Sequence, residues 1–305
     1  MIIGGLQKFS LLDYPGCLSA IIFTEGCNFR CHFCYNPMLV LPRVARANKK
    51  KGHSRIAESG LFDFLKSRAG KLEAVVITGG EPTLHKDLPE FIKKIKKLGF
   101  KVKLDTNGTN PEMLLPLLTK ERDGVRSSPL VKGLRREHSA ERGKGGLIDY
   151  IAMDIKAPLD KYREVVGLSP FKLSLRAKPP RRSEAISAER ANRDCFVALP
   201  LNSGRSPHND SATGLSKIRK SIKIIMNSKV PYEFRTTVVP GLIKKEDIKK
   251  IGELIKGADK WFLQQFKPDT ELVNKKFQKV RPYSSKELEE MRKIGEKFVG
   301  ECGVR

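Results

Sequence analysis

Three cysteines near the N-terminus have the residue type and spacing that bind an iron–sulfur cluster. Cys27, Cys31 and Cys34 form a C-x3-C-x2-C pattern on one short segment. Three thiolates on one loop can hold three corners of a cubane [4Fe–4S] cluster, which normally takes four protein ligands. One iron is then left open for a substrate or cofactor. Because the apolar residues 18–23 lead into the triplet, we expect the loop at the C-terminal end of a strand.

A structural zinc site is the alternative interpretation of the same segment. Such a site needs a fourth Cys or His at similar spacing. His32 lies inside the triplet, but no second cysteine pair follows it. The other cysteines, Cys17, Cys195 and Cys302, are scattered, and we expect them to be small buried or incidental thiols.

Composition limits the class of protein. The chain has 305 residues, of which 39% are hydrophobic, enough for a core. No apolar stretch approaches the about 20 residues that span a bilayer, and the first residues do not resemble a signal peptide. Six cysteines in a chain of this length do not indicate a disulfide framework. We therefore expect a cytoplasmic protein without a membrane partner.

The formal net charge of +25 raises the possibility of nucleic-acid binding. The basic residues, however, are spread along the chain and form no recognisable nucleic-acid motif. Lys93, Lys94, Lys96 and Lys97, for example, fall on a helical pattern, where solvated charge is the usual role. A basic surface would also attract an acidic electron carrier, which suits a cluster that must be reduced. We regard nucleic-acid binding as the weaker interpretation.

Short apolar runs alternate with helical patterns along the chain. Alternation of this kind predicts parallel strands joined by right-handed crossovers. We expect strands at residues 18–24, 74–78, 101–106, 150–155, 233–238 and 260–264. We expect helices at residues 56–67, 87–98, 216–227, 245–256 and 285–299, and a further one that opens at Asn110.

Six such units predict an α/β fold, a partial (β/α)6 barrel that makes one domain of residues 1–305. Two stretches rich in Arg, Gly, Ser and Pro, residues 121–146 and 176–213, have no clear period, and we interpret them as long irregular insertions. The alternative for these stretches is a functional lid. Residues 43–55 form a further basic linker. Binding residues are expected at the C-terminal strand ends.

Polar motifs do follow the predicted strands. Gly79 and Gly80 would let a ligand approach the backbone, and Glu81 could accept a hydrogen bond from an ammonium group. Residues 104–109 and 152–158 place short polar and charged side chains at the next two strand ends. An arginine within an apolar strand, Arg235, must face the barrel mouth or pair with an anion, such as a carboxylate.

Taken together, these motifs resemble the radical S-adenosylmethionine (SAM) superfamily. The cysteine triplet is similar to its cluster loop, and residues 79–82 are similar to its GGEP motif, which contacts the amino group of the methionine moiety. The resemblance implies that Cys27, Cys31 and Cys34 bind a [4Fe–4S] cluster. It also implies that the open iron chelates SAM and that the reduced cluster cleaves SAM to a 5′-deoxyadenosyl radical.

Outside the two insertions, nearly all of the chain resembles the activating enzymes of glycyl-radical proteins, especially the anaerobic ribonucleoside-triphosphate reductase type. The segments that carry this resemblance are residues 9–16, 78–83, 103–108, 153–158 and 235–241. It implies an oxidoreductase whose cluster is reduced by flavodoxin or ferredoxin. The radical would then abstract hydrogen from a glycine of a partner, here anaerobic ribonucleotide reductase.

The resemblance assigns no catalytic residue beyond the cluster and SAM. The SAM-binding set that it implies is Gly79, Gly80, Glu81, Asp105, Asn107 and Arg235. In pyruvate formate-lyase-type activases, residues that match Asp105, Thr106 and Asp154 can also hold a monovalent cation. A rival within the same superfamily is an enzyme of the 7-carboxy-7-deazaguanine synthase type, which acts on a small molecule.

Overall fold

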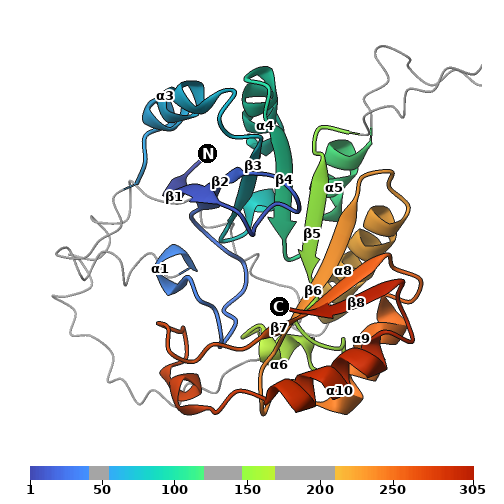
Figure 1. The fold of residues 1–305 in the computed structure, drawn as a ribbon. Helices are drawn as coiled ribbons and strands as arrows, with labels where there is room; N and C mark the ends of the chain where they lie inside the picture. Colours follow the sequence, from blue (N-terminus) through green and yellow to red (C-terminus); the bar gives the residue numbers. More distant parts are fainter. Residues whose placement is uncertain (41–54, 120–145, 169–209) are drawn as a thin grey trace, which may run out of the picture.

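An open, mostly parallel sheet of eight strands forms the framework of the protein. The computed structural model describes residues 1–40, 55–119, 146–168 and 210–305. The strands lie in chain order, β1 is antiparallel to β2, and each later pair is parallel. The sheet curves without closing, so β1 and β8 are its two edges (Figure 1). The strands are β1 (Ile3–Ser10), β2 (Ser19–Thr24), β3 (Ala74–Gly79), β4 (Lys101–Thr106), β5 (Tyr150–Asp154), β6 (Tyr232–Val238), β7 (Lys260–Gln265) and β8 (Glu301–Val304).

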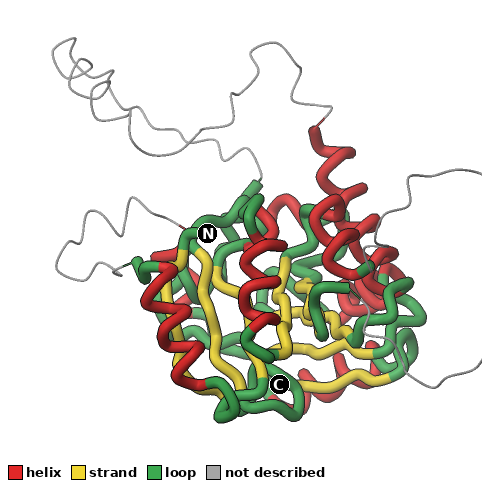
Figure 2. Tube along the Cα trace, turned by 90° about the horizontal axis from the view of Figure 1, so that it is seen from above, coloured by secondary structure: helices red, strands yellow, loops and turns green. Residues whose placement is uncertain are grey.

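The helices lie along the outside of the curved sheet (Figure 2). In α4 the buried residues Leu88, Phe91, Ile92 and Ile95 recur at helical spacing, and Gly99 follows the helix with a positive φ of 88°. Ser284 and Glu287 form a capping box at the start of α10. The longer helices are α3 (Glu58–Arg68), α4 (Leu88–Lys97), α5 (Pro111–Leu118), α8 (Asp210–Met226), α9 (Lys245–Leu254) and α10 (Ser285–Gly295). The short ones are α1 (Pro37–Val40), η1 (Pro82–Leu84), α6 (Tyr162–Val165) and η2 (Lys275–Lys279).

Side-chain alternation divides the buried residues into two clusters. Val75 and Ile77 of β3 belong to the large core shared with the helices. Ala74 and Val76 of the same strand instead pack in a small cluster with Tyr14 and Tyr150. This second cluster lies inside the curve of the sheet, and the segment that follows β1 covers it from the N-terminal ends of the strands. The segment does not cover the C-terminal ends of the strands, and the candidate active site lies there.

The α/β prediction is confirmed, and the six expected strands correspond to β2 to β7. The two edge strands were not expected. β1 contains two adjacent glycines and little alternation, and β8 has only four residues. Both are therefore held by backbone pairing, β1 to the next strand β2 and β8 to β7, and periodicity alone does not reveal such pairing.

The predicted boundary of the second insertion was wrong at its C-terminal end. The helix α8 begins at Asp210, so residues 210–213 are helical and not part of an irregular segment that ends at 213. Composition alone does not locate a helix end, which depends on backbone hydrogen bonding. The rest of the two insertions, apart from Gly146, lies outside the described residues, as does most of the basic linker. The single-domain assignment stays a prediction. Within the described ranges, no helix has the length and apolar character needed to cross a bilayer.

One buried hydrogen-bond chain joins β5, β6 and β7 and can be tested. The only tryptophan, Trp261, donates from Nε1 to Thr236 Oγ1 at 3.0 Å, and Thr236 Oγ1 donates to the Ile155 carbonyl at 2.9 Å. Replacing Thr236 with valine keeps the shape but leaves the buried indole N–H without an acceptor. We expect the free energy of unfolding to fall by about 1–3 kcal/mol. Urea unfolding followed by Trp261 fluorescence measures this.

The matched control is Thr237→Val. Thr237 Oγ1 has only a long contact of 3.4 Å to Gln264, so the same substitution should cost less. Equal losses in the two variants would contradict the assigned role of Thr236.

Candidate active site

The three cysteines lie on the loop that connects β2 to α1, at the C-terminal edge of the sheet. This loop is tied to its surroundings by backbone bonds: Gly26 N–H donates to Leu39 O and Arg30 N–H donates to Val166 O, both at 2.9 Å. Cys31 is buried, whereas Cys27 and Cys34 are half-buried, and all three are free thiols. The sequence predicted this position of the cysteine loop at the end of a strand.

Burial holds the three thiols in their neutral form. It raises the pKa of Cys27 to about 11 and that of Cys31 to about 12, and it also raises the pKa of Cys34. The nearby Lys156 ammonium acts in the opposite direction on all three. A metal ligand must be a thiolate, so cluster binding would release protons, and Lys156 is the side chain that favours the charged form.

Three cysteine thiols on one loop are a donor set that a cubane cluster accepts. Such a cluster spreads its thiolate ligands over different irons. Cys27, Cys31 and Cys34 would hold three irons of such a cluster and leave the fourth open for SAM.

The glycine pair after β3 lies directly against the cluster loop. Gly80 N–H donates to Thr24 O, and Glu81 N–H donates to Gly26 O, both at 2.8 Å. A Cβ on Gly80 would lie 1.9 Å from Gly26 O, so no other residue fits there without moving the loop. The sequence predicted that these glycines would admit a ligand. In the structure they lie against the backbone of the cluster loop, and their contact with a ligand stays a prediction.

Glu81 is a buried carboxylate that joins the ends of β3 and β4. Its Oε1 accepts hydrogen bonds from the hydroxyls of Thr83 at 2.5 Å and Thr106 at 2.7 Å, and its Oε2 accepts one from Asn107 N–H at 2.6 Å. Burial raises the pKa of Glu81, and these hydrogen bonds partly oppose that rise. The carboxylate is thus already supplied with protein donors.

Asn107 links the end of β4 to the cluster loop. Its Nδ2 donates to Asn28 Oδ1 at 2.8 Å and lies 3.9 Å from Cys27 Sγ. Asn28 in turn donates to Thr109 Oγ1 at 2.8 Å. The predicted site residue Asn107 is therefore next to a predicted cluster ligand. Asn28, inside the triplet, was missed because its spacing carries no signal of its own.

Arg235 forms a half-buried ion chain across three strands. Its Nη1 donates to Asp105 Oδ2 at 3.0 Å and its Nε donates to Asp154 Oδ1 at 2.9 Å. Lys156 Nζ donates to the other oxygen of Asp154 at 2.9 Å. Burial alone would raise the pKa of Asp154, but attraction to Arg235 and Lys156 outweighs it and lowers the pKa to about 2. Of the alternatives expected for Arg235, the structure shows pairing with a carboxylate, and its contact with SAM stays a prediction.

This arrangement bears on the monovalent cation that the resemblance implies. The guanidinium of Arg235 bridges Asp105 and Asp154, two of the three residues expected to hold that ion. The remaining oxygen, Asp105 Oδ1, is buried without a hydrogen bond and lies 3.4 Å from Lys103 Nζ. The chain itself thus supplies positive charge to both carboxylates, and the cation stays a prediction.

A second set of charges lies deeper inside the sheet and was not predicted. Lys103 donates to the Asp13 carbonyl at 2.5 Å and lies 3.7 Å from Glu233, whose carboxylate also pairs with Arg305. Lys103 and Asp105 alternate with apolar neighbours on β4, as Glu233 and Arg235 do on β6. That alternation in the sequence was the available signal, since residues two apart on a strand share a face.

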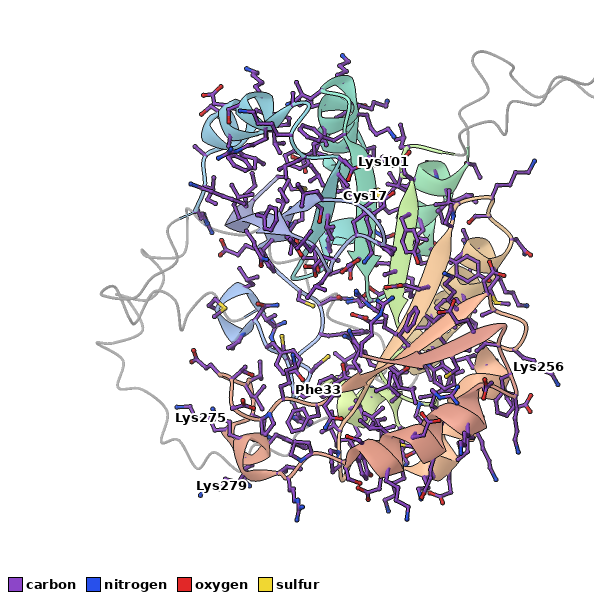
Figure 3. The ribbon with its side chains drawn as sticks, in the orientation of Figure 1. Cys17, Phe33, Lys101, Lys256, Lys275 and Lys279 are labelled. Carbon is purple, nitrogen blue, oxygen red and sulfur yellow. The ribbon has the colours of Figure 1, made fainter. Side chains whose placement is uncertain are left out.

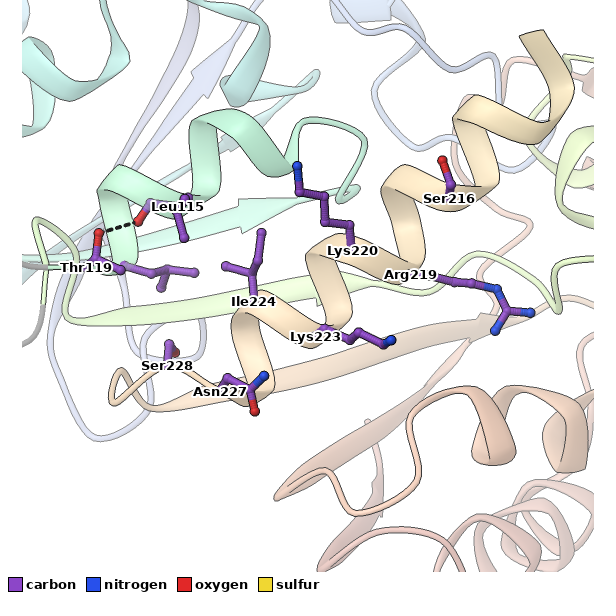
Figure 4. A pocket seen from close by; sticks show the side chains of 10 residues that line it. Leu115, Thr119, Ser216, Arg219, Lys220, Lys223, Ile224, Asn227 and Ser228 are labelled. Carbon is purple, nitrogen blue, oxygen red and sulfur yellow. Dashed lines mark hydrogen bonds between the residues drawn. The ribbon is translucent and has the colours of Figure 1, made fainter. Parts of the chain in front are cut away.

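A groove of about 590 Å³ lies elsewhere, between α5 and α8 (Figure 4). Leu115 and Ile224 line it together with Arg219, Lys220 and Lys223. None of its lining residues comes from the cluster loop or the C-terminal strand ends, so it is not part of the site described above.

The contact between Gly80 and the loop can be tested by adding one methyl group. In Gly80→Ala the new Cβ would meet a backbone oxygen that cannot rotate away, so the cluster loop must shift. We expect reconstituted protein to lose most of its iron while the free energy of unfolding falls by about 1–3 kcal/mol. Iron analysis checks the first statement, and urea unfolding followed by far-UV circular dichroism checks the second.

The control for that experiment is Gly60→Ala on α3. No atom lies within 4 Å of a Cβ at Gly60. Full iron content and a gain of about 0.5–1 kcal/mol are expected there. Full iron content in Gly80→Ala would show that the loop does not depend on this contact.

Removal of Arg235 should change the pH dependence of stability. Asp154 has a folded pKa of about 2 against an ordinary 3.8, so its stabilising contribution is present above pH 4 and is lost as the pH falls through 2. In Arg235→Gln, Asp105 and Asp154 each lose one cationic partner, at a cost of about 3–5 kcal/mol near neutral pH. Unfolding curves from pH 7 to pH 2 should show this deficit shrinking on acidification.

The matched control is Arg292→Gln on α10. Arg292 pairs with Glu289 and Glu296 at the surface, so the loss should be at most about 1 kcal/mol. A deficit in Arg235→Gln that does not depend on pH would refute the ionic explanation.

Comparisons with known proteins identify the family of this chain. A protein of Methanocaldococcus jannaschii named for glycyl-radical enzyme activation is 30% identical over 305 residues, covering 100% of this chain and 95% of that protein. The 7-carboxy-7-deazaguanine synthase of Aquifex aeolicus is 29% identical over 163 residues, 53% of this chain and 66% of that enzyme.

Among solved structures, Streptococcus suis SuiB bound to S-adenosylmethionine aligns with a TM-score of 0.48 and 12% identity, covering 91% of this chain and 45% of SuiB. We draw nothing further from so distant a likeness. The profile of the radical SAM superfamily matches residues 21–177. The chain therefore belongs to the radical SAM superfamily, whose members use a [4Fe–4S] cluster and S-adenosylmethionine.

Proposed function

We propose that this protein cleaves SAM reductively in order to generate a glycyl radical on a partner enzyme. The observation that carries the proposal is the convergence of the cysteine loop, the Gly79–Gly80 turn and Asn107 at one edge of the sheet. The Methanocaldococcus relative named for glycyl-radical enzyme activation supports this class because the alignment spans both proteins nearly end to end.

In this proposal Cys27, Cys31 and Cys34 hold the cluster, and its reduced form supplies the electron that cleaves SAM. Gly79 and Gly80 line the amino-acid end of SAM, with Asp105, Asn107 and Arg235 further round the strand ends. The Glu81 carboxylate already accepts hydrogen bonds from protein donors. We therefore propose that it fixes the strand ends around the SAM site and does not pair directly with the SAM ammonium group.

The partner and the electron source are the finer parts of the proposal. We propose anaerobic ribonucleotide reductase as the protein that receives the radical, and flavodoxin or ferredoxin as the reductant. The cytoplasmic location expected from the sequence likewise stays a prediction.

A second candidate is an enzyme that acts on a small molecule. The Aquifex aeolicus 7-carboxy-7-deazaguanine synthase favours it, although that alignment covers only 53% of this chain. The two candidates share the SAM site and differ in what receives the radical.

Anaerobic reconstitution tests the proposal. We expect about four irons per chain, SAM-dependent formation of 5′-deoxyadenosine with dithionite, and a glycyl radical in the electron paramagnetic resonance spectrum when the candidate reductase is added. Cys31→Ala should lose the cluster and SAM cleavage together, whereas Cys17→Ala should keep both because Cys17 packs in the inner apolar cluster.

Each failure has a separate meaning. Full iron content and activity in Cys31→Ala would refute the cluster assignment. SAM cleavage without a glycyl radical on the reductase would favour the small-molecule candidate.

A further inference from the structure

The segment between β7 and α10, residues 266–284, lies across the cluster loop. Asn274 N–H donates to His32 O at 3.0 Å, and Lys267 N–H donates to Tyr35 Oη at 3.0 Å. The rings of His32 and Phe277 stack, with centroids 5.8 Å apart and planes 11° from parallel. This segment, the cover of the cluster loop, thus contacts two loop residues that neighbour the cluster cysteines, His32 and Tyr35.

This cover is basic and open to solvent. Residues 266–284 contain five basic and two acidic side chains. None of the five basic residues forms an ion pair with an acidic side chain in the described part of the chain. The exposed basic residues are Lys267, Lys275, Lys276, Lys279 and Arg281. Unpaired lysines occur on the outer helices as well; what distinguishes these five is that their segment contacts the cluster loop.

The placement of these charges can be followed in Figure 3. Lys275 and Lys279 lie on the same side of the molecule as Phe33 of the cluster loop, whereas Lys256, after α9, lies at the other end. The contacts of Asn274 and Phe277 with His32 agree with this view. A protein bound to the lysines of η2 would therefore sit above the loop that holds the cluster.

A cluster that cleaves SAM must receive one electron for each event. Electron tunnelling weakens steeply with distance, so the donor has to approach the cluster closely. Long-range attraction between a positive and a negative patch raises the rate of such encounters and orients them. A positive cover over the cluster loop meets both requirements for a donor whose own surface is acidic.

We propose that residues 266–284 form the docking surface for the acidic one-electron carrier that reduces the cluster. The carrier loses one electron and the oxidised cluster gains it. The electron then passes to SAM, whose carbon–sulfur bond breaks to give methionine and the 5′-deoxyadenosyl radical. This inference rests on the proposed function, because it assumes that the cysteine loop carries the redox-active cluster.

The test compares a protein donor with a chemical one. The variant is Lys275→Glu with Lys276→Glu and Lys279→Glu in the full-length, reconstituted protein. Its control, Lys249→Glu with Lys256→Glu and Lys297→Glu, makes the same charge change at exposed lysines that also lack ion pairs among the described residues. Each protein cleaves SAM with limiting reduced flavodoxin, or with dithionite, at several salt concentrations.

With flavodoxin, we expect the variant to cleave SAM roughly tenfold or more slowly than the wild type and the control. With dithionite, which needs no docking surface, all three rates should agree. The flavodoxin-driven rate of the wild type should fall as salt rises, and the variant should lose most of that salt dependence.

Three results would overturn the inference. Equal flavodoxin-driven rates would show that the surface is not used, and an equal loss with dithionite would show damage to the site. A variant that cleaves SAM normally with flavodoxin but no longer activates the partner would make the surface a dock for the glycyl-radical protein. Failure of the proposed function is distinct, since the wild type would then not cleave SAM even with dithionite.

Discussion

The buried carboxylate of Glu81 is the point on which the geometry of the site depends. Its hydrogen bonds hold the ends of β3 and β4 together, and its own N–H group ties the same turn to Gly26 of the cluster loop. An ionisable group so deeply buried is stable only when it is hydrogen-bonded, so these contacts act together. The cysteine loop is placed relative to the strand ends by this junction.

A line of charges extends from that junction across the inner face of the sheet. Asp105, Arg235, Asp154 and Lys156 alternate in sign and come from three neighbouring strands. Each carboxylate faces at least one cation, and attraction to Arg235 and Lys156 lowers the pKa of Asp154 despite burial. The last cation of the line, Lys156, also favours the thiolate forms of the cluster cysteines, so the strand ends and the cluster loop form one electrostatic unit.

The outer side of the cluster loop has a different character. There the loop contacts residues 266–284, whose basic side chains are exposed to solvent. Exposed charges carry little desolvation cost and can attract an oppositely charged partner from a distance. Buried charges on one side fix the site, whereas exposed charges on the other can attract a partner. Five basic side chains of this positively charged chain therefore lie beside the cluster loop, on residues 266–284.

The sequence by itself determined the fold class and the strands β2 to β7, and it predicted the cluster ligands. Each depends on local information: cysteine spacing, apolar runs and the residues that end helices. Gly79, Gly80, Asp105 and Asn107 were also placed correctly at strand ends, because parallel strands bring their C-terminal ends to one edge, and Arg235 was placed correctly within its strand. Their binding roles stay predictions.

Only the tertiary structure decided which groups face one another. It showed that Gly80 accommodates the cluster loop, that Arg235 lies between two aspartates and that residues 266–284 cover His32. It also supplied the edge strands β1 and β8, and it placed the start of α8 at Asp210. Apart from the pairing of β1 with β2 and the start of α8, these features depend on pairs of residues far apart in the chain, and spacing along a single sequence carries no record of contacts made across a sheet.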